Sequence, residues 1–591
     1  MPLPKMLFNK STPTDHNLSL ISGVWPEGMT GELILSAPHP DTFDNPHPFF
    51  GDGMTYRLSL ESGTHGAPEE GFAWRQRLID SPSARLRALK PKVFRATHIG
   101  VQSPFGMSNA ANTAPLPWGD RLFTTWDVGR PVEIDPVTLG FLGEVGHRSE
   151  WKDFEVFEQP LLPLVMTTAH PVVDPDRNVL WTVNMFWGEL HVVRWDGQNP
   201  LQMWPISGGL IPQSVHTITQ TRDWLIIGDC AFKVEPQVLT GGDRLEPANA
   251  SGPVYLIRKD ALEAVPAGTP VEAKVFEIAP EINHYYAMYE DSAGIQVLFE
   301  HTQNADLAMT QGPGDIDALG RPVDPALCGL FGFPMSPDRN TLIEFNPETG
   351  KVRERAEQRD PSLLWSRQLN AMDWSTEGRS NPTVHHQVHL GWRPEAVTQK
   401  MLALYADRID RSEWPAEETP PLLTTTSMPD LELMTHHEFA MDDMPSSPIF
   451  VPRDPGSVPG SSRYAGANPG GHDGYVVVPV LNDKGFRVEV FDAAAVGAGP
   501  IATLGGPASA RGVAAEPAEA GSVAGSSGVA VPFILHSAWM PRVVASEDRP
   551  RVKFSDELGR VDELPEELAA AARQVAREID EGIPMQASTV H

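Results

Sequence analysis

The sequence predicts an all-β fold built from many short strands. Segments rich in valine, isoleucine, threonine and aromatic residues recur along the chain, and turn residues bound each of them. The 57 prolines and 50 glycines are spread evenly, which is typical of many short elements rather than long helices. A unit in which Asp-Pro or Asn-Pro joins two strands also recurs, at 133–145, 172–181 and 344–354. This weak repeat favours a β-propeller, and a large β-sandwich remains the alternative.

The expected strands follow one another through most of the chain. Ten of them are clear, at 121–128, 178–187, 189–195, 223–230, 252–258, 271–278, 294–301, 340–346, 474–481 and 487–493. Each is short, β-branched or aromatic in composition, and followed by a turn signal.

Helices are expected in only two places, at 395–410 and at 564–582. In the second, Pro565 suits a first turn and Gly582 suits the end. Its apolar residues fall near one face, which would pack on the body of the protein; they are Leu564, Leu568, Val575 and Ile579.

We expect one propeller domain over 1–552 and a C-terminal helical extension over 553–591. The segment 505–530 consists mostly of small residues, and we interpret it as a flexible loop inserted before the last strand. The segment 452–474 has a similar composition and is expected to be another surface excursion.

Composition excludes several classes of partner. A net charge of −31 argues against nucleic acid and against an anionic membrane surface. The N-terminal segment lacks the apolar core of a signal peptide, and no apolar run reaches the length of a membrane span, so a cytoplasmic protein is expected. The two cysteines, Cys230 and Cys328, exclude a disulfide framework and argue against a thiolate metal site.

Four of the 19 histidines, His170, His216, His301 and His536, lie in or at the end of apolar, strand-like segments. In a propeller the innermost strand of every blade reaches the central axis, so such residues can converge. Four neutral imidazoles suit a first-row divalent ion, and Fe(II) held in this way keeps positions open for dioxygen. A histidine in an apolar strand is nevertheless more often a satisfied core residue. The "HHQVH" segment at 385–389 offers two histidines on one face, and we expect it to be structural.

The segments around these histidines resemble a known family. "PFFGDGMTYRLSLESG" (48–63), "TTAHPVVDP", "SVHTITQT", "FEHTQNA" and "VPFILHSAWMP" are similar, in this order, to the motifs of the carotenoid cleavage oxygenases, a family of non-haem iron enzymes. The segment 112–144 resembles the family's next blade, and the resemblance covers roughly 20–545. The region 384–409 indicates a divergent bacterial branch.

The resemblance implies a seven-bladed β-propeller with a loop and helix cap over one end. It implies Fe(II) on the axis as the cofactor, with His170, His216, His301 and His536 as ligands. The family also carries carboxylates that accept hydrogen bonds from the ligands. One of these falls at Asp127 and another position is Ser447, while the third is not recognisable in 363–374, which occupies its place.

The implied reaction is cleavage of a C=C bond of an apolar polyene, a carotenoid or apocarotenoid, by dioxygen to give two carbonyl products. Candidate pocket aromatics are Trp126, Phe299 and Trp539. Stilbene cleavers of the family carry lysine at the position of Trp126, which favours a polyene. The alternatives are a stilbenoid-cleaving dioxygenase, a metal-dependent hydrolase and an inactive propeller that binds an apolar ligand. Peripheral membrane contact, which family members make, stays open.

Overall fold

In a computed structural model of the chain, the residues described are 3–4, 11–39, 50–67, 69–94, 102–154, 159–233, 235, 244–291, 294–304, 306–329, 331–333, 335–371, 381–453, 471–506, 531–547 and 549–585. Most of the two predicted surface excursions lies outside these residues, at 454–470 and 507–530. Within the described ranges, no helix is both long and apolar enough to cross a membrane.

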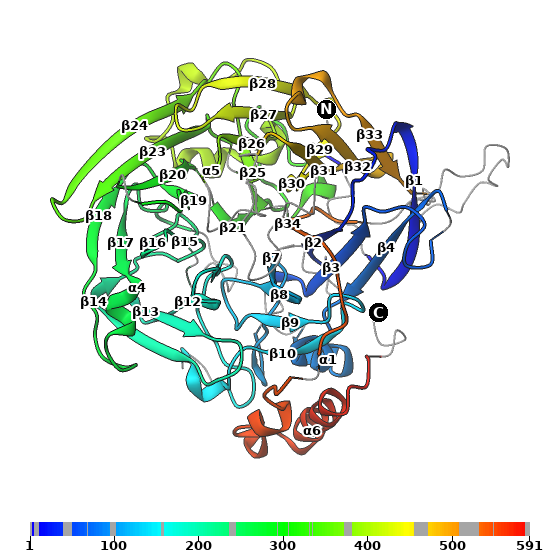
Figure 1. Cartoon of the computed structure of the whole chain (residues 1–591), viewed down its shortest axis with the longest axis vertical. Helices are drawn as coiled ribbons and strands as arrows, with labels where there is room; N and C mark the ends of the chain where they lie inside the picture. The colour runs from blue at the N-terminus through cyan, green and yellow to red at the C-terminus, as the bar shows by residue number, and fades with distance from the viewer. Residues whose placement is uncertain are drawn as a thin grey trace.

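Antiparallel sheets are arranged in a ring around a central region (Figure 1). Blade 1 contains β34 (His536–Met540), β2 (Glu32–Pro38), β3 (Gly53–Ser59) and β4 (Gly71–Leu78). Blade 2 contains β7 (Ala114–Trp118), β8 (Arg121–Thr125), β9 (Val132–Ile134) and β10 (Phe141–Glu144). Blade 3 contains β11 (Val172–Asp174), β12 (Val179–Phe186), β13 (Glu189–Trp195) and β14 (Gln202–Leu210). Blade 4 contains β15 (Ile218–Gln220), β16 (Trp224–Gly228), β17 (Gly252–Arg258) and β18 (Lys274–Ile278).

The chain continues around the ring in the same direction. Blade 5 contains β19 (Ile282–Ala287), β20 (Ile295–His301), β23 (Arg339–Asn346) and β24 (Lys351–Arg359). Blade 6 contains β25 (Arg367–Ala371), β26 (Val384–His389), β27 (Leu422–Ser427) and β28 (Leu433–Glu438). Blade 7 contains β29 (Met444–Pro445) and β30 (Ile449–Pro452), which both pair with β31 (Gly474–Asn482), then β32 (Gly485–Asp492) and β33 (Ala502–Gly505). The described residues thus form seven blades, which confirms the propeller and excludes the β-sandwich.

Strands from the two ends of the chain close the ring. β1 (Thr14–Gly23) pairs with β33 on one side and with β4 on the other. β34, near the C-terminus, pairs with β2 and completes the inner edge of blade 1. Two short hairpins add to the blades: β5 (Gln102–Ser103) pairs with β6 (Gly106–Met107), and β21 (Asp306–Thr310) pairs with β22 (Phe331–Gly332).

The first strand of each blade lies toward the centre. Figure 1 shows β15, β19 and β25 near the centre of the ring, and β14, β18 and β24 at its rim. Apolar side chains fill the space between neighbouring blades, as in the cluster of Val254, Tyr285, Val297 and Phe299 between blades 4 and 5. A side chain on an innermost strand can therefore reach the axis, whereas one on a second strand is set back from it.

The described residues contain few α-helices. They are α1 (Pro82–Leu89), α2 (Pro91–Phe94), α4 (Lys259–Glu263), α5 (Gln399–Leu404) and α6 (Glu566–Asp580). The helix expected at 395–410 is only α5, because Thr398 caps its start by accepting a hydrogen bond from the Met401 amide and the chain turns again at Tyr405.

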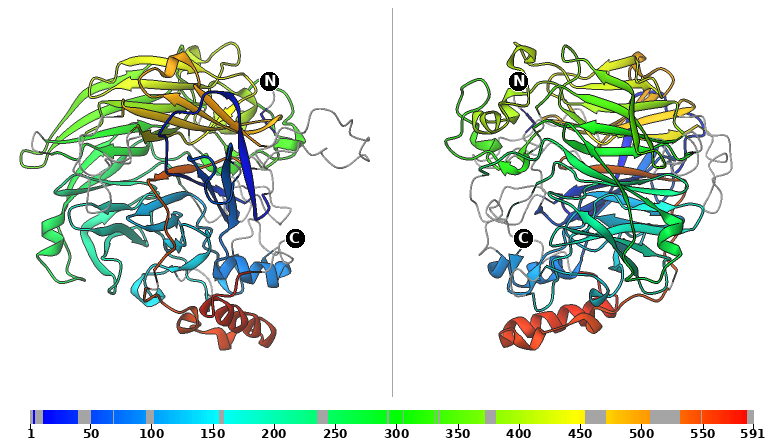
Figure 2. Two further views of the ribbon diagram at one scale, coloured as in Figure 1. Left: turned by 45° about the vertical axis from the view of Figure 1, so that its right-hand side comes forward. Right: turned by 90° about the vertical axis from the view of Figure 1, so that its left-hand side faces the viewer.

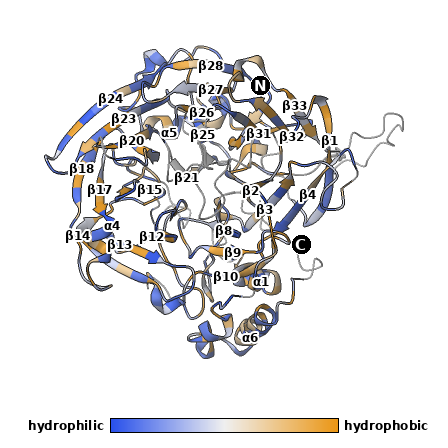
Figure 3. Ribbon diagram, in the orientation of Figure 1, coloured by the Kyte–Doolittle hydropathy of each residue, from blue (hydrophilic) through white to orange (hydrophobic). Residues whose placement is uncertain are grey.

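The C-terminal helix is confirmed as α6, which begins after Pro565. It is amphipathic, with apolar and polar residues both visible along it in Figure 3. Leu568 and Val575 are buried in a cluster with residues of α1, and the two side views place α6 beside α1 on one side of the molecule (Figure 2). The division between 552 and 553 stays a prediction.

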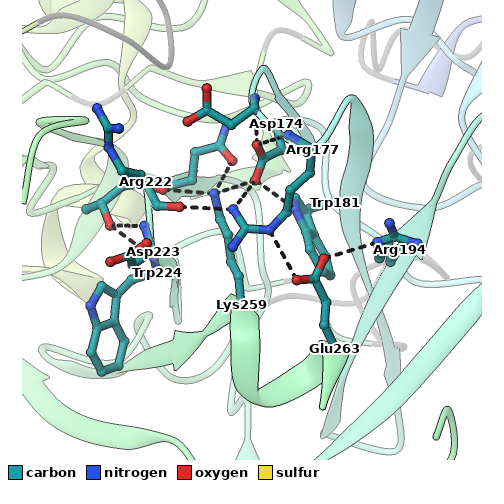
Figure 4. A network of polar contacts seen from close by, with 12 residues as sticks. Asp174, Arg177, Trp181, Arg194, Arg222, Asp223, Trp224, Lys259 and Glu263 are labelled. Carbon is teal, nitrogen blue, oxygen red and sulfur yellow. Dashed lines mark hydrogen bonds and ion pairs between the residues drawn. The ribbon is translucent and has the colours of Figure 1, made fainter. Parts of the chain in front are cut away.

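A buried charged network joins blades 3 and 4 (Figure 4). Lys259, at the start of α4, and Asp174, at the end of β11, are both fully buried. The Lys259 ammonium donates to Asp174 Oδ2, to Gln220 Oε1 and to the Thr221 carbonyl, each at 2.8 Å. All three ammonium hydrogens are thereby used, as a buried cation requires.

Candidate metal centre

Four histidines converge at the inner ends of four blades. His170 and His216 stand just before β11 and β15, His284 lies in β19, and His536 begins β34. One ring nitrogen from each of the four lies within 4.8 Å of the others. The ring centroid of His170 is 4.9 Å from that of His216, 5.1 Å from that of His284 and 4.3 Å from that of His536. Three of these, His170, His216 and His536, are histidines that the sequence singled out.

The backbone fixes two of these residues directly against each other. The His170 amide donates to the His216 carbonyl at 3.2 Å, and the Ile218 amide donates to the His170 carbonyl at 3.3 Å. The Thr168 hydroxyl also donates to the His216 carbonyl, at 2.8 Å. The segments that enter blades 3 and 4 are thus held side by side, which keeps the backbones of His170 and His216 together.

His301 does not belong to this cluster, and the prediction that grouped it with the other three is wrong. It ends β20, the second strand of blade 5, and both of its ring nitrogens are used elsewhere. Nδ1 pairs with the Pro280 carbonyl at 2.9 Å, and Nε2 pairs with the Thr341 hydroxyl at 2.7 Å. The structure places His284 from the first strand of the same blade in the fourth position of the cluster.

A local irregularity explains why His284 is hard to find in the sequence. The pairing of β19 with β20 shifts register between Ile282 and Tyr285, which is where His284 lies. Such bulges redirect side chains and interrupt the alternation by which a strand is recognised. The one available signal is position, since His284 is the histidine that falls in the first strand of its blade.

Three of the four imidazoles are neutral near pH 7. Burial, with the neighbouring histidines as a further cause, lowers the pKa values of His170 and His284 well below the usual range. Burial also lowers the pKa of His536 to about 3. A neutral imidazole offers a lone pair, which is the form that binds a metal ion.

Several ring nitrogens of the cluster are buried without a hydrogen-bond partner. They are Nε2 of His170 and both Nδ1 and Nε2 of His284. Leaving such groups unpaired costs about 1–3 kcal/mol each, so the arrangement indicates a partner that is not part of the chain. A divalent transition metal fits, because four converging neutral imidazoles are a donor set for such ions. His216 and His284 are buried, while His170 and His536 keep partial exposure, so the cluster is not sealed on all sides.

Asp127 lies where the sequence predicts it, beside a histidine of the cluster. Its two carboxylate oxygens are 2.9 and 3.0 Å from Nδ1 of His216. Nε2 is therefore the nitrogen that His216 presents to the cluster. At the second predicted position, Ser447 brings no carboxylate, and its carbonyl accepts a hydrogen bond from the Ser537 hydroxyl.

A further acid, Glu300, was not singled out from the sequence. One of its carboxylate oxygens is 3.6 Å from Nδ1 of His284. Burial raises its pKa to about 7. The residue immediately precedes His301, whose own side chain has no part in the cluster.

The predicted pocket aromatics are placed in apolar cores. Trp126 packs with Met107 and Leu164, and its ring centroid is 6.3 Å from that of Phe50. Phe299 is fully buried in the core between blades 4 and 5, and Trp539 donates from its indole to the Thr30 carbonyl at 3.2 Å. Substrate contact stays a prediction for all three.

Another aromatic residue lies against the cluster itself. The ring centroid of Phe232 is 4.3 Å from that of His216, and the ring is only partly buried. It follows the strand β16 by four residues, in a segment that the sequence pattern did not mark.

Comparison with known proteins agrees with this architecture. A family model described as RPE65, retinal pigment epithelial membrane protein, matches residues 8–511. Among curated proteins, the chain is 29% identical over 125 residues to carotenoid cleavage dioxygenase 7, chloroplastic, of rice (Oryza sativa subsp. japonica), and 27% identical over 168 residues to apocarotenoid-15,15'-oxygenase of Synechocystis. These alignments span 20% and 27% of this chain, and 19% and 32% of the relatives.

Solved structures show the same fold over nearly the whole chain. A variant of the Synechocystis apocarotenoid oxygenase superposes with a TM-score of 0.56 at 16% identity, covering 91% of this chain and 98% of that one. A lignostilbene dioxygenase from Pseudomonas brassicacearum gives a TM-score of 0.58 at 16% identity, covering 92% and 100%. A cobalt-substituted form of the Synechocystis protein gives 0.54 at 15% identity, covering 90% and 98%.

Proposed function

The chain belongs to the RPE65/carotenoid cleavage oxygenase family, and from this premise we propose that it is an Fe(II)-dependent dioxygenase that cleaves a C=C bond of an apolar polyene. One observation carries the proposal, namely the convergence of His170, His216, His284 and His536 with buried, unpartnered ring nitrogens. A family likeness alone would not require this donor set to be intact.

The residues of the chain fit an iron ion, because they offer imidazole nitrogens as donors and an imidazole binds a metal in its neutral form. Neutral imidazoles from four blades would hold it on the axis. When bound, Fe(II) would supply open coordination positions and the electron density that dioxygen activation requires. Asp127 accepts from Nδ1 of His216, which orients the ring and keeps its Nε2 lone pair directed inward.

The surroundings of the cluster suit an apolar substrate. Phe232 places an aromatic ring beside His216, on the cluster itself. The partial exposure of His170 and His536 provides a side from which substrate and dioxygen would reach the ion. The task of the chain is then to place one double bond of an extended molecule beside the metal, which is a positioning role.

Trp126 favours a polyene over a phenolic stilbenoid. This position lies in an apolar cluster with Met107, Ala110 and Leu164. An indole in such surroundings offers no cationic group to a phenol oxygen. The name of the Synechocystis relative, an apocarotenoid oxygenase, is in keeping with a polyene substrate. We therefore propose a carotenoid or apocarotenoid as substrate, with a stilbenoid as the competitor to be tested against it.

The proposal is tested by product analysis under labelled dioxygen. The full chain is loaded anaerobically with Fe(II), mixed with a set of carotenoids, apocarotenoids and hydroxylated stilbenes, and exposed to ¹⁸O₂. We expect two carbonyl products from a polyene, each carrying one labelled oxygen, and none from a His536→Ala variant treated identically. Iron-loaded protein that consumes no dioxygen with any substrate would refute the enzyme. Cleavage of stilbenes alone would refute the substrate assignment.

A further inference from the structure

The surroundings of Glu300 in the fold satisfy only one of its two carboxylate oxygens. It lies in β20, the neighbour of the strand that carries His284, and its side chain is fully buried. Oε1 accepts hydrogen bonds from the Asn370 amide at 2.8 Å and from the Gln387 amide at 2.9 Å, both supplied by blade 6. Oε2 is buried with no hydrogen-bond partner. A structural carboxylate would have both oxygens satisfied, so the free oxygen calls for a functional explanation.

The free oxygen is directed at the cluster. Oε2 of Glu300 lies 3.6 Å from Nδ1 of His284, and that nitrogen is itself unpartnered. The separation is about 0.6 Å longer than an ordinary N–H···O hydrogen bond, so a small rotation of the ring closes it. Asp127 and His216 already show the closed arrangement, with a carboxylate oxygen 2.9 Å from Nδ1.

We infer that Glu300 is the positioning carboxylate of His284, accepting a hydrogen bond from its Nδ1 and thereby directing Nε2 to the metal. The inference rests on the proposed function. It also accounts for Asn370, which lies in the segment where the sequence led us to expect an acid. Its side-chain amide donates to Glu300, so this segment of blade 6 supplies a partner that holds the acid of the neighbouring blade in place.

Charge supports the same assignment. A divalent cation held by four neutral imidazoles leaves two positive charges in a largely buried site. Asp127 and Glu300 both contact cluster histidines, and in their ionised forms they would offset this charge. A buried cation that lacks compensating charge is strongly disfavoured, so removing either carboxylate should weaken metal binding.

The test compares isosteric variants of three carboxylates in the full chain. Glu300→Gln removes the inferred acceptor while conserving volume, and Asp127→Asn does the same at His216. Asp443→Asn is the matched control, because Asp443 is a buried carboxylate that pairs with Arg487 and lies outside the cluster. Affinity for Co(II) and Fe(II) is measured anaerobically by competition with a chelator, and the visible spectrum of bound Co(II) reports on ligand geometry. Thermal unfolding of the metal-free proteins checks that each variant folds.

We expect Glu300→Gln and Asp127→Asn to weaken metal binding by about 10- to 100-fold and to change the Co(II) spectrum, while Asp443→Asn stays within about twofold of the wild type. Glu300→Asp keeps the carboxylate on a shorter side chain and should show a smaller loss of metal affinity. It replaces Glu300→Gln in the test if that variant does not fold. Wild-type affinity and spectrum in folded Glu300→Gln, beside a weakened Asp127→Asn, would overturn the inference and leave the proposed function standing. A wild-type chain that binds neither metal would overturn both.

Discussion

Replacing Lys259 with methionine should destabilise the protein strongly, although the residue is not a member of the histidine cluster. The change removes an ammonium group that donates to three buried acceptors, one of them the carboxylate of Asp174. Burial lowers the pKa of Lys259 to about 8, against the opposing effect of Asp174, so the group is still charged at pH 7. Methionine fills a similar volume, so the loss is electrostatic rather than a cavity.

The expected loss in free energy of unfolding follows from the Asp174 carboxylate, which stays buried without its cationic partner. Removing one partner of a buried ion pair typically costs about 3–5 kcal/mol, because the other charge stays buried and unpaired. Asp174 keeps other donors, including the Arg177 amide at 2.9 Å. We therefore expect about 3–4 kcal/mol for Lys259→Met, and recovery of about half of it when Asp174→Asn is added to remove the stranded charge.

The assay is urea unfolding at pH 7, followed by tryptophan fluorescence and compared as shifts in midpoint at a common slope. Lys274→Met is the matched control, since Lys274 lies exposed in β18, and its shift should stay within about 0.5 kcal/mol. A Lys259→Met variant within about 1 kcal/mol of the wild type would refute the view that this network joins blades 3 and 4. If the losses of stability caused by Lys259→Met and Asp174→Asn add in the double variant, the explanation by a buried, unpaired carboxylate is refuted.

Two further predictions concern titration and substrate contact. Burial raises the pKa of Asp229 from 3.8 to about 6, against the hydrogen bonds from Gln213 and Ser214, so the folded state holds the proton more tightly than the unfolded chain. The resulting stability, up to about 3 kcal/mol, is complete below about pH 4 and is lost as the pH rises through 6. Unfolding of Asp229→Asn between pH 4 and 7 should lack this slope, and a slope equal to that of the wild type would contradict the assignment. Phe232→Ala should raise the KM for an apolar substrate about 10-fold at unchanged metal content, since the contact of a partly buried ring with substrate is worth about 1–2 kcal/mol. Loss of metal in this variant, or an unchanged KM, would show that Phe232 does not contact the substrate.

Much of the fold could be predicted from local sequence. The β-rich segments and their Asp-Pro and Asn-Pro turns mark individual blades, because strand and turn formation depend on neighbours in the chain. The closure of the ring could not be predicted from them. β1 pairs with β33 and β4, and β34 pairs with β2, which depends on partners hundreds of residues apart rather than on local pattern.

In the candidate site, too, some residues could be predicted from local sequence and others could not. His170, His216 and His536 stand out because each precedes or begins an innermost strand within an apolar segment. His284 does not, because the register shift beside it hides the alternation. His301 ends a strand of regular apolar pattern, so it stands out although its ring bonds elsewhere. The resemblance drew attention to "FEH" for its histidine, yet in that segment the glutamate makes the contact with the cluster.

The identity of the fourth ligand is the most direct test of this account. The wild-type chain, His284→Ala and His301→Ala are each loaded anaerobically with Fe(II), desalted, and assayed for iron per chain by mass spectrometry. We predict about one iron in the wild type and in His301→Ala, and a large loss in His284→Ala. Iron retained by His284→Ala and lost from His301→Ala would contradict the metal centre described for this propeller.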